Sequence, residues 1–350
     1  MNPHNILVIK LRYLGDVLLA TPTLDALKTA YPAARLSVLV NRGTEEILHG
    51  NPHVDEIIPL DRGSMLQQSC FVLEMRWRRF DTVVDLTDGD RAAFLTWISG
   101  APVRIGFNAE QRWTGWCYTT VVTGAGVHRI ERDLASLAPL GIDVEERVPR
   151  MWLTREDETR AEQLVADLGA PKDQSWVVIQ PGARYWFKAW PVERFAQLAD
   201  RLNERFGCQV FIGGTGHEAR LAEAVVGRAK SRLLNIAGRA DVRTFAALLR
   251  RSDLFVGNDT GAMHIAAAVG TPVVGLFGPS NPAEWGPRGG PSEVIYKGLD
   301  CRVCFHPTCR RGEENCMNLI TVDEVMAACT RLLEARKKMS ARSRIEGRWQ

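Results

Sequence analysis

Four short stretches of the sequence combine glycines with acidic or basic side chains at the end of an apolar run, as strands that end in ligand-binding turns do. The most distinctive is Gly-Asn-Asp-Thr-Gly-Ala-Met-His at residues 257–264, where an alanine-rich helical pattern begins directly after the apolar residues 254–256. The N–H groups at such a helix N-terminus favour a phosphate group. We expect Asp259 or Asn258 to cap this helix and His264 to lie one turn inside it. On this stretch alone, an ordinary strand–helix turn with a packed histidine is an equal alternative.

A second stretch places Gly15 and Asp16 after the apolar run 6–9, where a helical pattern starts. Glycine permits a tight turn there, and the aspartate then lies at the first turn of the helix. A carboxylate in that position could act as a general base toward a substrate hydroxyl. A helix-capping aspartate is the alternative interpretation.

The other two stretches follow strands in the second half of the chain. Residues 180–191 combine Arg184 and Lys188 with four aromatic residues, and paired cations suit a diphosphate. The next stretch has Gly214 in a glycine run, which lets a ligand approach the backbone closely. Glu218 follows early in the next helix and could accept hydrogen bonds from ribose hydroxyls. The alternative for residues 180–191 is a solvated loop.

Strands that alternate with helices must position these stretches. The predicted strands are residues 6–9, 36–40, 57–60, 82–86 and 103–107 in the first half, and 176–180, 210–212, 233–236, 254–256 and 272–277 in the second. This alternation predicts an α/β fold of two Rossmann-like, doubly wound parallel sheets, with ligands bound at the carboxyl ends of the strands. The predicted domains are residues 1–150 and 151–335, followed by a basic tail at 336–350.

The composition excludes several classes of protein. A chain of 350 residues is too long for one core, and 45% hydrophobic with 24% charged residues is typical of a globular enzyme. A net charge of +3 gives no argument for a nucleic-acid partner. The sequence shows neither a membrane span nor a signal peptide, so we expect a cytoplasmic protein. No G-x-G-x-x-G motif follows the first predicted strand, which disfavours a dehydrogenase, and no P-loop motif occurs in the sequence, which disfavours an NTPase.

Four of the eight cysteines fall within sixteen residues. They are Cys301, Cys304, Cys309 and Cys316. Their spacing is compatible with structural zinc, with an iron–sulfur cluster or with a loop of free thiols, because only the first interval is Cys-x₂-Cys. We expect no catalytic metal and no cofactor.

Together these stretches resemble the lipopolysaccharide heptosyltransferase family, which transfers heptose from ADP-heptose to the lipopolysaccharide inner core. The matching residues are 10–22, 188–191, 257–264, 277–280 and 285–287, and the likeness runs from about residue 6 to residue 333. The resemblance implies a GT-B architecture, with the acceptor-binding domain first and the ADP-heptose-binding domain second, facing across a cleft.

The resemblance also implies roles for particular residues. Asp16 would be the catalytic base of an inverting, metal-independent transfer, and Lys188 would hold the diphosphate and assist its departure. The residues expected to bind the donor are Arg184, Gly214, Glu218, Asp259, Thr260, Gly261 and His264. Those expected to bind the acceptor are Lys10, Arg12 and Gly15.

The branch of the family is less sharply indicated. Residues 12–16, 84–88 and 183–188 look most like heptosyltransferase III, whereas the four-cysteine segment is more like that of many heptosyltransferase II sequences. Another nucleotide-sugar transferase of surface polysaccharide synthesis is an alternative. So is a non-catalytic nucleotide-sugar binding protein, although Asp16 argues against it.

The acceptor implied by the resemblance is anchored by lipid in the inner leaflet. Basic and aromatic residues of the first half would then face acceptor phosphates or make peripheral contact with the membrane. The candidates are Arg76, Trp77, Arg78, Arg79, Arg112 and Trp113. A solvated helix end and a packed loop are the alternative.

Overall fold

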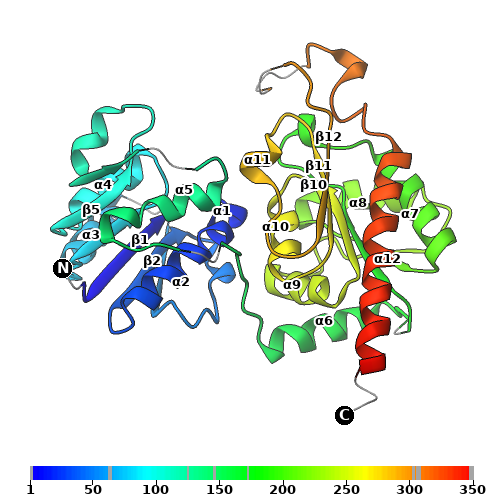
Figure 1. Ribbon diagram of the computed structural model, residues 1–350, viewed down its shortest axis with the longest axis horizontal. Coiled ribbons are helices and arrows are strands. Elements are labelled where there is room, and N and C mark those ends of the chain that lie inside the picture. Colours follow the sequence, from blue (N-terminus) through cyan, green and yellow to red (C-terminus); the bar gives the residue numbers. More distant parts are fainter. Residues whose placement is uncertain are drawn as a thin grey trace. The chain divides into compact units, whose positions relative to one another are not determined.

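The computed structural model describes residues 3–61, 65–123, 126–144, 147–171, 173–301, 304 and 309–346. The chain divides into two compact units, residues 1–152 (the first unit) and 153–350 (the second unit). Each unit contains one six-stranded sheet with helices packed against it (Figure 1). The two units are described separately below.

The sheet of the first unit is entirely parallel, in the order β3-β2-β1-β4-β5-β6. Its strands are β1 (Asn5–Lys10), β2 (Arg35–Asn41), β3 (Glu56–Leu60), β4 (Thr82–Asp85), β5 (Val103–Phe107) and β6 (Thr120–Val122). Its helices are α1 (Leu14–Leu19), α2 (Thr21–Ala30), α3 (Met65–Trp77), α4 (Asp90–Ile98) and α5 (Arg129–Ala135). The strand order reverses between β1 and β4, and such a reversal leaves a ligand crevice at the carboxyl ends of the strands.

The sheet of the second unit has the same topology. Its strand order is β9-β8-β7-β10-β11-β12 when the sheet is followed from the β9 edge. Its strands are β7 (Trp176–Gln180), β8 (Gln209–Ile212), β9 (Leu233–Asn235), β10 (Leu254–Asn258), β11 (Val273–Phe277) and β12 (Ser292–Tyr296). Its helices are α6 (Arg155–Asp167), α7 (Val192–Phe206), α8 (Ala219–Val226), α9 (Val242–Arg251), α10 (Gly261–Ala268), α11 (Pro282–Trp285) and α12 (Val322–Glu346). The reversal here lies between β7 and β10.

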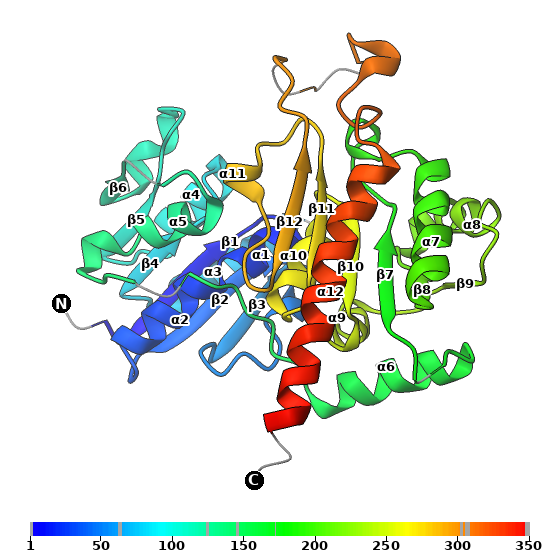
Figure 2. The ribbon, with the colours of Figure 1, turned by 45° about the vertical axis from the view of Figure 1, so that its right-hand side comes forward.

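The central strands are buried on both faces, as continuous apolar runs predict for parallel sheets. All five residues of β7, β10 and β11 are buried. Figure 2 shows α12 running along one face of this sheet beside α7. Both helices contribute to the same core, with Phe195 and Leu198 from α7 and Val325 and Cys329 from α12. Burial of these two apolar stripes fixes the helices to the strands that carry the candidate site.

Two strands, β6 and β12, and two helices, α11 and α12, were not predicted. The sequences of β6 and β12 lack the continuous apolar run of a buried strand, because both strands lie at sheet edges and keep several side chains partly exposed. Residues 336–346, expected to belong to a basic tail, continue α12 instead. The first of them, Arg336, donates from Nε to Asp253 Oδ1 at 2.9 Å, which ties this part of the helix to the sheet.

Candidate active site

Asp16 lies in α1, the helix that follows the central strand β1 at the carboxyl edge of the first sheet. It is partly buried in the first turn of α1, next to the buried Gly15. Arg129 and Asp133 of α5 lie close enough to Asp16 to interact with its charge. Burial lowers the pKa of Arg129, and the negative charges of Asp133 and Asp16 oppose that shift. Asp16 is therefore a carboxylate at a strand-order reversal with a guanidinium nearby, a suitable place for proton transfer.

Lys10 is buried in an ion pair. Its side chain is 2% exposed, and its ammonium donates to Asp133 Oδ2 at 2.5 Å and to the carbonyl of Leu86 at 3.1 Å. This buried ion pair occupies the ammonium, and acceptor binding by Lys10 stays a prediction. The pair fixes α5 against β1.

Three arginines bind Asp88 at the carboxyl edge of the first sheet. Arg12 donates from Nη2 to the carbonyls of Thr87 at 2.9 Å and Asp88 at 3.3 Å. Arg112 donates from Nη1 to the Asp88 carbonyl at 2.9 Å and to its Oδ1 at 3.3 Å. Arg132 pairs with the Asp88 carboxylate from α5. Asp88 itself has a φ of +55°, an uncommon conformation for a residue other than glycine.

Two of these arginines were singled out from the sequence, Arg12 as acceptor-binding and Arg112 as facing acceptor phosphates or the membrane. Asp88 follows β4 by only three residues, and that position after a strand was the available signal. The three guanidinium groups form a positively charged corner that suits a phosphate or carboxylate.

Asp85 is a buried carboxyl group below this corner. Its oxygens accept hydrogen bonds from Tyr118 Oη at 2.6 Å and from the Thr87 backbone N–H at 2.7 Å. Burial raises the pKa of Asp85 to about 6, although both hydrogen bonds oppose the shift. The native state therefore holds this proton more tightly than the unfolded chain does.

We expect Asp85→Asn to remove part of the pH dependence of stability. Between the ordinary aspartate pKa of 3.8 and about 6, native Asp85 binds more protons than unfolded Asp85, so the free energy of unfolding falls as pH rises. The stabilising contribution of Asp85 is complete below the unfolded-state pKa of 3.8 and is lost as the pH rises through the native-state pKa of about 6. The lost contribution is about 3 kcal/mol at pH 7.

Urea unfolding from pH 4 to 7.5 measures this decline in the free energy of unfolding. The exposed Asp143→Asn variant should keep the decline, and an Asp85→Asn curve parallel to wild type would contradict the assignment.

The second sheet positions Lys188 and Asp259 at its own strand-order reversal. Lys188 ends a short 3₁₀ turn (Trp186–Lys188) after β7, and its ammonium donates to Asp259 Oδ2 at 2.7 Å. Lys188 is partly exposed, whereas Asp259 is buried. The structure thus brings together two predicted site residues that are 71 positions apart.

Asn258 fixes the loop that carries Lys188. Its Oδ1 accepts from the Trp190 backbone N–H at 3.1 Å, and its Nδ2 donates to the carbonyls of Pro181 at 2.9 Å and Gly182 at 3.1 Å. The predicted capping role of Asn258 or Asp259 is wrong, since both side chains bind this loop instead. The sequence signal for this clamp is the position of Asn258 at the end of β10.

The N-terminus of α10 has the features of an anion site. Its N-cap residue is Thr260, whose side chain makes no capping hydrogen bond, and helical residues begin at Gly261. The Oγ1 atom of Thr260 is buried without a hydrogen-bond partner. His264 is buried one turn further along. An orphaned hydroxyl beside open helix N–H groups is suited to receive phosphate oxygens.

Glu218 lies at the neighbouring edge of β7 and β8. Its Oε2 accepts from Gln180 Nε2 at 3.2 Å and from the Thr215 N–H at 2.8 Å. Its carboxylate lies against Gly182, where any Cβ atom would clash, and its Cβ would be 3.2 Å from a Cβ at Gly214. Glu218 therefore sits beside the loop that holds Lys188.

Arg184 is placed differently from the other predicted donor residues. It is exposed, and its guanidinium lies over the Tyr185 ring, 5.7 Å from the ring centroid. The structure therefore places Arg184 at the surface of the loop.

The cysteine segment stands apart from these residues. Cys301, Cys304, Cys309 and Cys316 are free thiols. Burial and the neighbouring thiols raise the pKa of both Cys304 and Cys316. Within the described ranges, no group of three or more His, Cys, Asp or Glu side chains could hold a metal ion.

Comparison with known proteins gives consistent results. The family model described as glycosyltransferase family 9 (heptosyltransferase) matches residues 71–314. Lipopolysaccharide heptosyltransferase 3 of Escherichia coli is 30% identical over 335 residues, covering 92% of this chain and 97% of that protein. Lipopolysaccharide heptosyltransferase 2 of Salmonella typhimurium is 25% identical, covering 83% and 87%.

Two solved structures show the same fold. A family 9 glycosyl transferase from Veillonella parvula aligns with a TM-score of 0.84 at 24% identity, over 96% of this chain and 99% of that one. The ADP-heptose lipopolysaccharide heptosyltransferase II of E. coli aligns with a TM-score of 0.78 at 22% identity, over 95% and 99%. These likenesses confirm the predicted fold class, two doubly wound parallel-sheet domains of the GT-B type.

Proposed function

Since the chain belongs to glycosyltransferase family 9, the heptosyltransferase family, we propose that it transfers heptose from ADP-heptose to the inner core of lipopolysaccharide. The observation that carries the proposal is the arrangement at the reversal of the second sheet. There the Lys188–Asp259 pair follows the ends of β7 and β10, and Asp259 directly precedes the open N-terminus of α10. A cation and a helix N-terminus suit a sugar diphosphate.

The donor would be held by the second unit. Thr260 and Gly261 present backbone N–H groups, and the orphaned Thr260 hydroxyl supplies one more donor for a phosphate oxygen. Glu218 would accept hydrogen bonds from the ribose hydroxyls beside Gly214, and Asp259 from hydroxyls of the heptose. His264 and Arg184 complete the proposed donor-binding set.

Asp16 would be the base of an inverting, metal-independent transfer. The acceptor hydroxyl oxygen attacks the anomeric carbon while the bond from that carbon to the phosphate oxygen breaks, and Asp16 takes the hydroxyl proton. ADP leaves with the bonding electrons, and Lys188 and the α10 N-terminus stabilise its negative charge. A cation already placed at the diphosphate needs no reorganisation during the reaction.

The acceptor would bind to the first unit, beside Gly15 and Arg12. The corner formed by Arg12, Arg112 and Arg132 around Asp88 suits an anionic group of the inner core. Heptosyltransferase III activity is the proposed specificity, supported by the likeness to lipopolysaccharide heptosyltransferase 3. No helix within the described residues is long and apolar enough to cross a bilayer. We place the protein in the cytoplasm, in peripheral contact with the inner leaflet.

Transfer from ADP-heptose to lipopolysaccharide cores truncated at successive heptose positions tests the proposal. Product only on the core that lacks the branch heptose is the expected result. Product only on the core that lacks the second heptose would assign heptosyltransferase II activity instead. If ADP binds but every core stays unmodified, the donor or acceptor is a different one, or the protein binds nucleotide sugars without catalysis.

A further inference from the structure

Four aromatic rings form a continuous exposed row on the first unit. They are Phe94 and Trp97 of α4, and Trp113 and Trp116 of the 3₁₀ helix η2 (Trp113–Cys117); together we call them the aromatic quartet. Their ring centroids are 6.5 Å apart for Trp113 and Phe94, 5.7 Å for Phe94 and Trp97, and 5.3 Å for Trp97 and Trp116. All three contacts are edge-to-face.

Local geometry places these rings on one face. Residues 94 and 97 are one turn apart on α4, as residues 113 and 116 are on η2. Thr114 Oγ1 donates to Asp90 Oδ1 at 2.8 Å, and this bond holds η2 along α4. The structure therefore maintains the quartet as a fixed surface.

The quartet does not serve the core of the unit. Trp113 is 67% exposed and Trp116 is 51% exposed, while other side chains of the same elements, such as Ala93 and Cys117, are buried. Contiguous exposed apolar patches are uncommon on soluble monomers and mark interaction surfaces. Tryptophan in particular prefers the boundary between water and lipid, because its ring is apolar and its N–H is polar.

The charges around the quartet favour an anionic partner. Arg91 of α4 is exposed, as is Arg76, whose guanidinium packs on Gly100 just beyond the end of α4. Of the exposed acidic groups nearby, Glu110 is paired with Arg112. Asp90 accepts a hydrogen bond from the neutral Thr114 hydroxyl and keeps its negative charge, which leaves Arg76 and Arg91 in excess by one positive charge.

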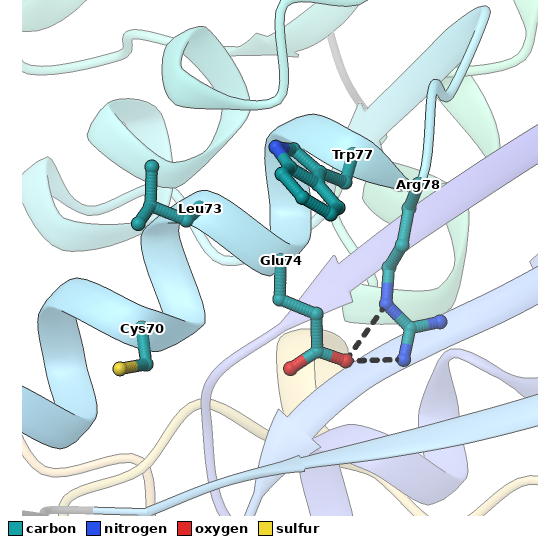
Figure 3. Close-up of a pocket in the computed structure, with 5 residues that line it drawn as sticks. All are labelled: Cys70, Leu73, Glu74, Trp77 and Arg78. Atoms are coloured by element: carbon teal, nitrogen blue, oxygen red, sulfur yellow. Dashed lines mark hydrogen bonds and ion pairs between the residues drawn. The ribbon is translucent and has the colours of Figure 1, made fainter.

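A second apolar surface lies on the neighbouring helix α3. Figure 3 shows Leu73 and Trp77 on successive turns, beside the hydrogen-bonded Glu74 and Arg78. With Cys70 they line a pocket of about 530 Å³. Leu73 and Trp77 are both well exposed. Two adjacent helices of the same unit thus expose large apolar side chains.

We propose that the aromatic quartet docks the chain on an anionic lipid bilayer, with its rings at the head-group level and Arg76 and Arg91 against the head groups. The proposal rests on the proposed function in one respect: a lipid-anchored acceptor requires the acceptor-binding unit to reach a membrane. Docking through this unit would keep it at the surface that holds the acceptor.

Binding of the full chain to vesicles of phosphatidylcholine and phosphatidylglycerol, measured by co-sedimentation, tests the proposal. Trp113→Ser/Trp116→Ser should reduce partitioning by about tenfold or more, because the lost apolar area no longer enters the interface. Tyr296→Ser, which removes an exposed aromatic ring from the second unit, should bind like wild type. Arg91→Gln should weaken binding to these vesicles and leave binding to pure phosphatidylcholine unchanged. A urea-unfolding transition at the wild-type midpoint shows that each variant is folded.

Activity separates this inference from the proposed function. The tryptophan double variant should transfer normally to a water-soluble, delipidated acceptor and poorly to an acceptor embedded in vesicles. Equal vesicle binding by wild type and the double variant would overturn the docking surface, as would a wild-type dimer that the double variant loses. Quartet-dependent binding without transfer to any acceptor would support docking and overturn the proposed function.

Discussion

Asp16→Ala should lower the turnover number by about 10²- to 10⁴-fold, the usual contribution of a general base, and leave the dissociation constant for ADP unchanged. Alanine cannot take the acceptor proton, so the hydroxyl oxygen would attack as a poorer nucleophile. ADP binding should persist because the proposed donor residues belong to the second unit, residues 153–350. Steady-state transfer assays and calorimetric titration with ADP measure the two quantities.

Two further variants sharpen this test. Asp16→Asn keeps the shape of the side chain and should be as inactive as alanine, because an amide is not a base at neutral pH. Asp143→Ala removes an exposed carboxylate of the same unit and should retain wild-type turnover. Turnover within tenfold of wild type in both Asp16 variants would remove Asp16 from the catalytic role.

The parts of the site that the sequence could predict are those set by local structure. Asp259 follows the apolar strand β10 directly, and Asp16 lies in the first turn of the helix after β1. The carboxyl ends of parallel strands lie at one edge of a sheet. The aromatic and cationic run before Pro191 likewise marked the loop of Lys188. In each case a few consecutive residues specify the strand, the turn and the helix start.

The parts that were missed depend on partners distant in the sequence. Arg132 meets Asp88 across 44 residues, and Asn258 meets Trp190 across 68. Periodicity reports which face of an element is apolar, and it carries no information on which polar side chains meet after folding. The capping prediction for Asn258 failed for this reason, because the loop after β7 offered that amide better partners than the helix N-terminus did.

The edge strands β6 and β12 were missed for a different reason. β12 has exposed and half-buried residues in alternation, so its sequence lacks the continuous apolar run that marked the central strands. Such a strand is defined by pairing with β11 rather than by its own composition. The fold class could be predicted because the other ten strands, which include the edge strands β3 and β9, were sufficient to show the alternation.

Lys10→Met should reduce the free energy of unfolding by about 3–5 kcal/mol, because it leaves the Asp133 carboxylate buried without its partner. Burial already raises the pKa of Asp133, and the Lys10 ammonium opposes that shift. Lys28→Met is a matched control: its ion pair with Asp55 is 2.7 Å long, but the two side chains are 18% and 39% exposed. A partly exposed pair should contribute about 1 kcal/mol or less. Urea unfolding of both variants at neutral pH gives the comparison.

The double variant Lys10→Met/Asp133→Leu separates a positioning role from acceptor binding. Replacing both charges by apolar side chains removes the unpaired carboxylate, so much of the lost stability should return. If Lys10 only fixes α5 against β1, the double variant should also recover most of its turnover, with an acceptor KM near that of wild type. A double variant that is stable but has a strongly raised acceptor KM would contradict this positioning role. It would show that Lys10 contacts the acceptor.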